Sequence, residues 1–332
     1  MDLTTRYLGL DLAHPILPGA SPMSDDPDTA KKLEDAGAPA LVMSSLFEEE
    51  LATMPLAKGN GQLGTPVVPA DYRQGGLRVD PEDYFDRIYR LKHDLHIPVI
   101  ASLNGTTDGG WLKYALAMEQ AGADAVELNV YKVPTELGET SDEIEATTKA
   151  MVDSLRNRLA IPISVKLSPF ATALPNFASH LSEAGAEGLV LFNRFYQPHI
   201  DWPSMQPTRT LKLSTGDEIN LRLRWVAILA ERTTCDLCLS GGVTSGEDVA
   251  RAVACGANVA QVVTILYQKG PQHLAILRDE LIEAMNTADV HSVEGLRGRL
   301  AFQQTPHREA LVRANYYRQL RQTKADLAKS ST

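Results

Sequence analysis

The sequence predicts an α/β fold of the (β/α)8 TIM barrel type, with an N-terminal hairpin and long loops after the strands. Three observations lead to this prediction. Eight short apolar runs alternate with helical patterns, which is typical of a parallel sheet. A small-Gly-small junction recurs between helices and strands, and the last two apolar runs end in small residues at corresponding places. Eight such units in a chain of 332 residues favour closure of the sheet into a barrel.

The elements are expected in a regular order along the chain. A hairpin at 4–12 turns at Gly9. The eight barrel strands are expected at Pro15–Pro18, Ala40–Met43, Val99–Leu103, Ala125–Asn129, Ile163–Leu167, Gly188–Phe192, Asp236–Leu239 and Val259–Val263. The helices are expected at Pro27–Ala36, Glu82–Leu95, Trp111–Gln120, Asp142–Arg158, Pro175–Glu183, Ile219–Arg232, Gly246–Ala254 and Gln272–Asn286.

Four junctions between a helix and the next strand carry a glycine between small residues. These glycines are Gly37, Gly122, Gly185 and Gly256. Glycine at such a position ends a helix in the left-handed conformation. The junctions are expected at the amino-terminal end of the barrel, where sequence features serve stability rather than chemistry.

Composition limits the kinds of partner. The net charge is −10 and the pI is about 5.3, so no basic field is available for nucleic acid or an anionic membrane. The sequence has no cationic leader and no run of about 18 apolar residues. We therefore expect a cytoplasmic protein with a single domain over residues 1–332. Within it, 303–332 would form a C-terminal helix packed on the barrel or extending from it.

The three cysteines are Cys235, Cys238 and Cys255, an odd and low number that fits a reduced compartment. Cys235 and Cys238 have the C-x-x-C spacing and enter a predicted strand. No second pair and no nearby histidine completes a metal set. A packed, inert pair is the favoured interpretation, and no metal is expected.

Two neighbouring strand ends indicate a phosphate site. Gly241 and Gly242 follow the seventh barrel strand, where backbone N–H groups can approach a ligand with no Cβ in the way. Thr264 follows the eighth strand and can add a hydroxyl, while the helices after both strands supply positive N-terminal ends. Barrels commonly bind phosphate after these two strands. The alternative is that the glycines only shape two turns.

Lys166 ends an apolar strand, where an ammonium group is costly unless it meets a partner. One partner would be a flavin, because a fixed lysine stabilises the anion of its reduced form. Another would be Glu127, in an ion pair inside the mouth of the barrel. A third interpretation is a Schiff-base lysine of the aldolase kind.

Two long loops follow predicted strands, at 44–80 and 193–218. Their length, together with their place on the face where barrels carry their chemistry, favours lids. Asn129 and Asn193 stand at strand ends on the same face. Their amides both donate and accept hydrogen bonds, which suits the edges of a planar heterocycle.

Several short segments occur in an order and spacing that a known family shares. They are Gly19-Ala20-Ser21, Glu127-Leu128-Asn129, Val165-Lys166-Leu167-Ser168-Pro169, Phe192-Asn193, and the run from Ser240-Gly241-Gly242-Val243 through Gln261-Val262-Val263-Thr264 to Lys269-Gly270-Pro271. With these segments the chain resembles the dihydroorotate dehydrogenase family, closest to its soluble class. That family consists of FMN-containing (β/α)8 barrels that oxidise dihydroorotate to orotate in pyrimidine biosynthesis.

The resemblance implies a flavoprotein and assigns roles to residues. Lys166 would lie at the N1/O2 edge of the flavin, while Asn129 and Asn193 would bind a small cyclic substrate. Electrons would pass to a soluble acceptor or a redox partner protein, and a homodimer is expected. The residues expected to contact FMN are Ala20, Ser21, Ser44, Asn104, Asn129, Lys166, Gly241, Gly242, Val263 and Thr264.

The substrate half of the site departs from the family pattern. After Asn129 the family has a Cys or Ser base and a further Asn, where this chain has Lys132 and Pro134. Lys132 is therefore the candidate base, with a pKa lowered by desolvation, or else a solvated loop lysine. Ser44 stands where the family has a lysine, and 73–76 corresponds poorly to an Asn-containing turn of the family.

These departures leave three rival functions open. The first is a related flavoenzyme that acts on another substrate. The second is a flavoprotein subunit that relays electrons and lacks dihydroorotate activity. The third is a flavin-free, phosphate-binding aldolase with Lys166 as its Schiff-base residue.

Overall fold

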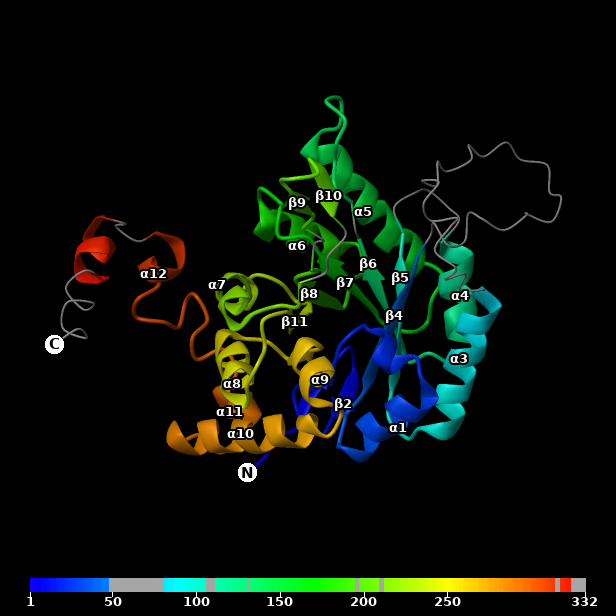
Figure 1. Ribbon diagram of the computed structural model, residues 1–332, viewed down its shortest axis with the longest axis horizontal. Coiled ribbons are helices and arrows are strands. Elements are labelled where there is room, and N and C mark those ends of the chain that lie inside the picture. The colour runs from blue at the N-terminus through cyan, green and yellow to red at the C-terminus, as the bar shows by residue number, and fades with distance from the viewer. Residues whose placement is uncertain are drawn as a thin grey trace.

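The computed structural model describes residues 1–47, 81–105, 111–130, 132–194, 197–208, 212–313 and 317–323. Eight parallel strands form one sheet in the order β3-β12-β11-β8-β7-β6-β5-β4, with helices around it (Figure 1). The strands are β3 Ile16–Pro18, β4 Leu41–Phe47, β5 Val99–Asn104, β6 Ala125–Asn129, β7 Ile163–Leu167, β8 Gly188–Leu191, β11 Asp236–Ser240 and β12 Val259–Val262.

The sheet is a nearly closed barrel. The last strand, β12, pairs with the first, β3, so the sheet curls back on itself. The seam lies between β3 and β4, which are in contact but form no hydrogen-bonded ladder within the described residues. The predicted α/β barrel is therefore confirmed.

Helices cover the outside of the barrel. The α-helices are α1 Pro27–Asp35, α3 Pro81–Asp94, α4 Leu112–Gln120, α5 Ser141–Arg156, α6 Leu174–Glu183, α7 Ile219–Leu229, α8 Gly246–Cys255, α9 Thr264–Lys269, α10 His273–Thr287, α11 Val293–Leu296 and α12 Glu309–Val312. Two short 3-10 helices are η1 Pro22–Ser24 and η3 Gly216–Glu218. The apolar faces of the α-helices pack against the outer face of the sheet, where the larger of two hydrophobic clusters lies.

The N-terminal hairpin closes the amino-terminal end of the barrel. Its strands, β1 Thr5–Tyr7 and β2 Leu10–Leu12, pair antiparallel as predicted. Leu8 and Gly9 both have positive φ, 53° and 73°, which is the geometry of a tight hairpin turn. The apolar cluster inside the barrel consists of Tyr7, Leu8, Leu12, Leu17, Ala40, Val42, Ile100, Ala125, Val190, Cys238 and Val259. The hairpin therefore supplies part of the core that fills this end.

The glycines predicted at the helix-to-strand junctions adopt the expected conformation. Their φ angles are 98° at Gly37, 101° at Gly122, 98° at Gly185 and 118° at Gly256. L-residues rarely adopt these values, so the recurring motif has a local steric cause.

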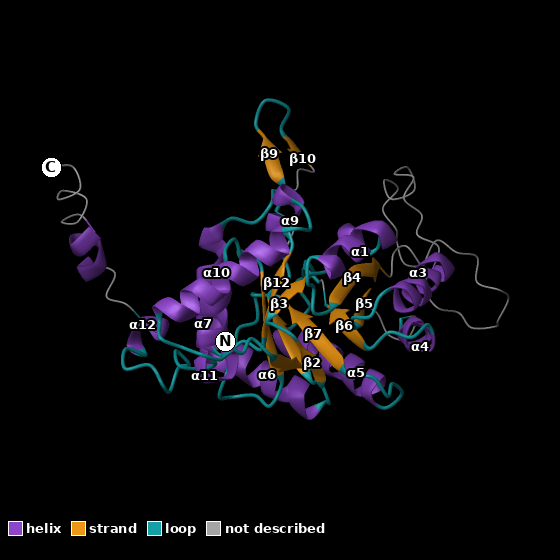
Figure 2. Cartoon of the chain, turned by 90° about the horizontal axis from the view of Figure 1, so that it is seen from below, coloured by secondary structure: helices purple, strands orange, loops and turns teal. Residues whose placement is uncertain are grey.

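The loop predicted at 193–218 contains structure that the sequence pattern did not indicate. It forms a second hairpin, β9 His199–Asp201 paired with β10 Gln206–Thr208, which projects from the molecule (Figure 2). The side chains of this hairpin are mostly exposed. It therefore lacks the alternation of buried and exposed residues by which a strand is found in a sequence.

The C-terminal segment is not one continuous helix where a helix was expected. The helix α12 spans only Glu309–Val312, and Arg313 after it is extended, with φ −151°. In both views α12 lies to one side of the barrel (Figures 1 and 2).

The cysteines are all free and buried. Burial raises the pKa of the Cys255 thiol to about 11, so this thiol stays protonated at neutral pH. Among the described residues, no group of three or more His, Cys, Asp or Glu side chains could hold a metal ion. None of the helices in the described part of the chain is both long and apolar enough to span a bilayer.

Candidate active site

A cavity of about 800 Å³ opens at the carboxyl-terminal ends of the barrel strands. A pocket of this size accommodates a ligand as large as a cofactor. The residues of its wall that were singled out from the sequence are Ala20, Ser21, Ser44, Asn129, Lys166, Asn193, Gly241, Gly242, Val263 and Thr264. The barrel topology thus brings strand ends that are far apart in the sequence to one place.

The floor of the cavity is a buried polar triad. Lys166 Nζ donates to Glu127 Oε1 and to Gln261 Oε1, both at 3.0 Å. Gln261 Nε2 donates to Glu127 Oε2 at 2.6 Å. Because an ammonium group has three N–H donors, these two acceptors leave one donor of Lys166 for a ligand.

This triad shows which partners Lys166 has within the described residues. The ion pair with Glu127 is present, and the Glu127 side chain is only 1% exposed. This pair does not test the flavin and Schiff-base interpretations, which both stay predictions. Gln261 was given no role in the site from the sequence, although a polar residue inside the apolar run at 259–263 is the same signal that singled out Lys166.

A chain of amide and hydroxyl groups crosses the middle of the site. Asn193 Nδ2 donates to Asn129 Oδ1 at 2.8 Å, and Asn129 Nδ2 donates to Ser45 Oγ at 3.3 Å. Ser45 Oγ lies 2.7 Å from Ser102 Oγ. The two asparagines therefore meet as expected, but each already has the other as a partner.

The Gly241–Gly242 turn requires glycine at both positions. The φ angles are 98° and 83°. A Cβ on Gly242 would lie 2.5 Å from the Ile219 nitrogen, and one on Gly241 would lie 2.8 Å from Arg222 Nε. Within the described residues, neither glycine N–H has a hydrogen-bond acceptor. Two backbone donors therefore remain for a ligand at this end of the cavity.

Thr264 lies beside this turn but its hydroxyl is engaged. Ser214 Oγ lies 2.8 Å from Thr264 Oγ1. The helix that Thr264 begins, α9, is only six residues long, so its dipole is small. The positive helix end expected after the eighth strand is thus weak, and the two hydroxyls form one polar surface.

The opposite rim holds a group of residues that sequence reasoning missed. Asp25 accepts hydrogen bonds from the Ser44 N–H, at 2.9 Å, and from the Ser44 hydroxyl. Arg87 Nη1, from α3, lies 3.8 Å from Asp25 Oδ2. Tyr84 donates to the Ser44 carbonyl at 2.9 Å, and burial raises the pKa of its phenol. Only the fold brings α3 to this strand end, so no local signal could have found the group.

Two residues singled out from the sequence are not in the cavity wall. Asn104 is 2% exposed, and its Nδ2 lacks a hydrogen-bond partner within the described structure. Lys132 is exposed and forms an ion pair with Glu139. The structure does not bring Lys132 to the wall of this cavity, and its role as the base stays a prediction. The segment at 73–76 lies outside the described residues.

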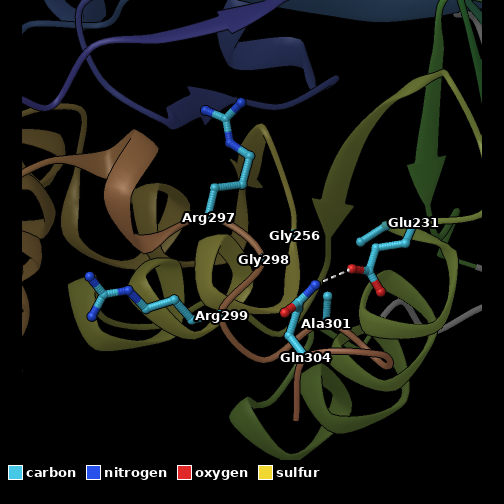
Figure 3. A pocket seen from close by; sticks show the side chains of 8 residues that line it. Glu231, Gly256, Arg297, Gly298, Arg299, Ala301 and Gln304 are labelled. Atoms are coloured by element: carbon cyan, nitrogen blue, oxygen red, sulfur yellow. Dashed lines mark hydrogen bonds between the residues drawn. The ribbon is translucent and has the colours of Figure 1, made fainter.

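A second hollow, of about 670 Å³, lies at the amino-terminal end of the barrel (Figure 3). Arg297 and Arg299 point in different directions there, and Arg297 donates to Thr5 Oγ1 at 2.7 Å. Gln304 Nε2 donates to Glu231 Oε1 at 2.7 Å. These side chains serve the packing of neighbouring elements and do not converge on one point.

Comparison with known proteins agrees with this arrangement. A family model for dihydroorotate dehydrogenase matches residues 79–285. A putative dihydroorotate dehydrogenase A (fumarate) of Aeropyrum pernix is 28% identical over 282 residues, which cover 82% of this chain and 89% of that protein. The catalytic subunit of dihydroorotate dehydrogenase B (NAD(+)) of Thermoplasma acidophilum is 26% identical over 310 residues, or 90% of this chain and 98% of that one. Dihydroorotate dehydrogenase A (fumarate) of Lactobacillus delbrueckii is 22% identical over 301 residues, covering 86% and 95%. The chain belongs to the dihydroorotate dehydrogenase family.

Proposed function

We propose that this protein is an FMN-dependent oxidoreductase that transfers a hydride between a small cyclic substrate and the flavin. The observation that carries the proposal is the combination, in one cavity, of two features. One is a two-glycine turn whose N–H groups have no acceptor among the described residues, and the other is a buried lysine with two acceptors there. The first suits a phosphate group, and the second suits the edge of an electron-accepting ring. Membership of the family supports the same cofactor.

The residues present fit FMN at both ends of the cavity. The phosphate would be held by the N–H groups of Gly241 and Gly242 beside Thr264, at a turn where a Cβ would collide with Arg222 or with the Ile219 backbone. The ring would lie against Ala20 and Ser21, with Lys166 at its edge. When bound, FMN accepts or donates the hydride. Lys166 supplies a fixed positive charge for the reduced ring, because Glu127 and Gln261 hold its ammonium group in place.

The substrate would bind where the two asparagines meet. Asn129 and Asn193 each keep donor and acceptor groups that could exchange their mutual bond for bonds to a planar heterocycle. The names of the relatives support dihydroorotate as the first substrate to test. The same names mention fumarate and NAD(+), so both are candidates for the soluble electron acceptor. We also propose that the protein works in the cytoplasm as a homodimer, as barrels of this type often do.

One observation favours a second candidate, a flavoenzyme of this family with another substrate. Lys132 stands where the family carries its base, yet its ammonium group is exposed and paired with Glu139. A base has to reach the proton that it removes. If this part of the site is altered, dihydroorotate would bind poorly or not react.

The test begins with the colour of the purified full-length protein. A yellow preparation that bleaches when dihydroorotate is added without oxygen supports both the cofactor and the substrate. A yellow preparation that dithionite bleaches but dihydroorotate does not would contradict the substrate and favour the second candidate. A colourless protein that takes up no added FMN would contradict the flavin proposal as a whole.

A further inference from the structure

The cations of the cavity are not balanced equally. Lys166 pairs with Glu127 at 3.0 Å, and Arg87 lies 3.8 Å from Asp25, so each has a carboxylate of its own. Two further cations are Arg194, in the described cavity wall, and Arg222, which lies behind Gly241. Both are close to the same carboxylate. That group is Glu218, next to the two-glycine turn. Among the described residues, two cations therefore face one carboxylate at this end of the cavity.

Arg222 is the fixed member of this group. It is 7% exposed and lies directly behind Gly241. Its Nε donates to the Ser240 carbonyl at 2.7 Å, and its Nη1 donates to the Glu218 carbonyl at 2.5 Å. Its Nη2 also lies 3.6 Å from the Glu218 carboxylate. These bonds hold the guanidinium in place and keep a cation beside Glu218.

Arg194 is the loosely held member. It lines the cavity directly after Asn193, and its side chain is 33% exposed. Its Nη2 lies 3.8 Å from Glu218 Oε1, too far for a hydrogen bond. Glu218 would not be left alone if Arg194 moved, because Arg222 and the Thr215 N–H, at 3.2 Å, would still contact its carboxylate. Arg194 can therefore turn to another anion at small cost.

We propose that Arg194 binds the phosphate group of the nucleotide flavin and makes this protein select FMN over riboflavin. The inference rests on the proposed function. The free N–H groups of Gly241 and Gly242 mark the phosphate position, and Glu218, whose backbone touches the same turn, places Arg194 beside it. A guanidinium group adds charge-assisted hydrogen bonds to a phosphate that uncharged amides do not supply.

The experiment compares two ligands that differ only in the phosphate. Full-length protein is stripped of flavin, and its affinities for FMN and for riboflavin are measured by quenching of flavin fluorescence. The wild type should prefer FMN. Arg194→Gln should weaken FMN binding by about 10- to 100-fold and leave riboflavin binding unchanged. Raising the salt concentration should weaken FMN binding less in the variant than in the wild type.

Arg87→Gln is the matched control, because it removes a cation from the other end of the same cavity. It should leave the ratio of the FMN and riboflavin affinities unchanged. The inference is overturned if Arg194→Gln keeps the wild-type ratio, or if Arg87→Gln lowers the ratio as much. A wild type that binds FMN no better than riboflavin overturns the inference and leaves the flavin proposal intact. A wild type that binds neither flavin overturns both.

Discussion

The two ends of the barrel are built from different chemistry. At the amino-terminal end, Tyr7, Leu8 and Leu12 of the hairpin fill the interior with apolar side chains. At the carboxyl-terminal end, the interior carries Glu127 and Lys166, and a cavity opens above them. One end is sealed by packing, while the other is lined with polar groups.

This difference separates stability from ligand binding. Apolar burial at the closed end stabilises the fold regardless of any ligand. Buried polar groups at the open end are costly unless each finds a partner. Lys166 has such a partner in Glu127. The N–H groups of Gly241 and Gly242 have no acceptor among the described residues. Similar substitutions at the two ends should therefore have different effects on stability and on ligand binding.

The largest loss of stability is expected from a substitution of Lys166, at the floor of the cavity at the open end. Lys166→Met would leave the Glu127 carboxylate, which is 1% exposed, without its cation. Removing one partner of a buried ion pair costs about 3–5 kcal/mol, so the free energy of unfolding in urea should fall by that order. Adding Glu127→Gln should restore much of the loss, because no unpaired charge would remain. Equal stability of the single and the double variant would show that the unpaired Glu127 charge is not the cause of the loss.

The next largest loss of stability is expected when Gly242, at the open end, is replaced by alanine, and Gly9 at the closed end provides the comparison. Gly242→Ala would place a Cβ 2.5 Å from the Ile219 nitrogen at φ 83°. The turn should shift, FMN should no longer bind, and stability should fall by more than the strain alone. Gly9→Ala is the matched control, because its φ is 73° and nothing lies within 4 Å of the new Cβ. It should cost only about 1–2 kcal/mol of left-handed strain and leave FMN binding unchanged. Full FMN binding by Gly242→Ala would remove the turn from the phosphate site.

The fold was accessible from the sequence because its signals are local. Each barrel strand is an apolar run of its own, and each junction glycine has a steric cause within a few residues. The same holds for Lys166 and the Gly241–Gly242 pair, since strand position alone places them at the mouth of a barrel. Such residues need only the correct order of elements to be found.

The rest of the site depends on contacts that no pattern encodes. Arg222 lies between leucines in a helical pattern, and it is buried because a glycine on another element leaves room for it. Asp25 and Arg87 come together from separate segments. For Lys132 the position in the sequence matches the family, but the side chain lies outside the cavity wall. Its place after Asn129 matches the family's base, but position in a loop does not fix the direction in which a side chain points.

At the closed end, a smaller and pH-dependent effect is expected from His14. Its Nε2 lies 2.8 Å from the Gly37 carbonyl, and its Nδ1 accepts a hydrogen bond from the Ile16 N–H at 3.2 Å. Burial lowers its pKa below the ordinary 6.5. The unfolded chain therefore binds a proton more readily than the folded one. The contribution of His14 to the free energy of unfolding should be fully present above pH 6.5 and should decrease as the pH drops below that value. It should level off once His14 is also protonated in the folded state.

The control for this pH dependence is His14→Gln, which cannot titrate. The free energy of unfolding of both proteins would be followed in urea between about pH 7.5 and pH 5. The wild type should lose stability on acidification more steeply than the variant. Parallel curves for the two proteins would mean that the slope arises from other groups.

The smallest effect is expected for Lys132, which lies on the open side of the barrel but outside the cavity. Lys132→Ala removes a solvent-exposed ion pair with Glu139, and such pairs contribute about 0–1 kcal/mol. Stability, FMN affinity and the rate at which substrate bleaches the flavin should all stay close to wild type. Lys166→Met, measured alongside, should differ in all three. A large loss of the bleaching rate in Lys132→Ala, with FMN binding intact, would instead show that the loop brings this lysine to the substrate and that the open end extends beyond the cavity described.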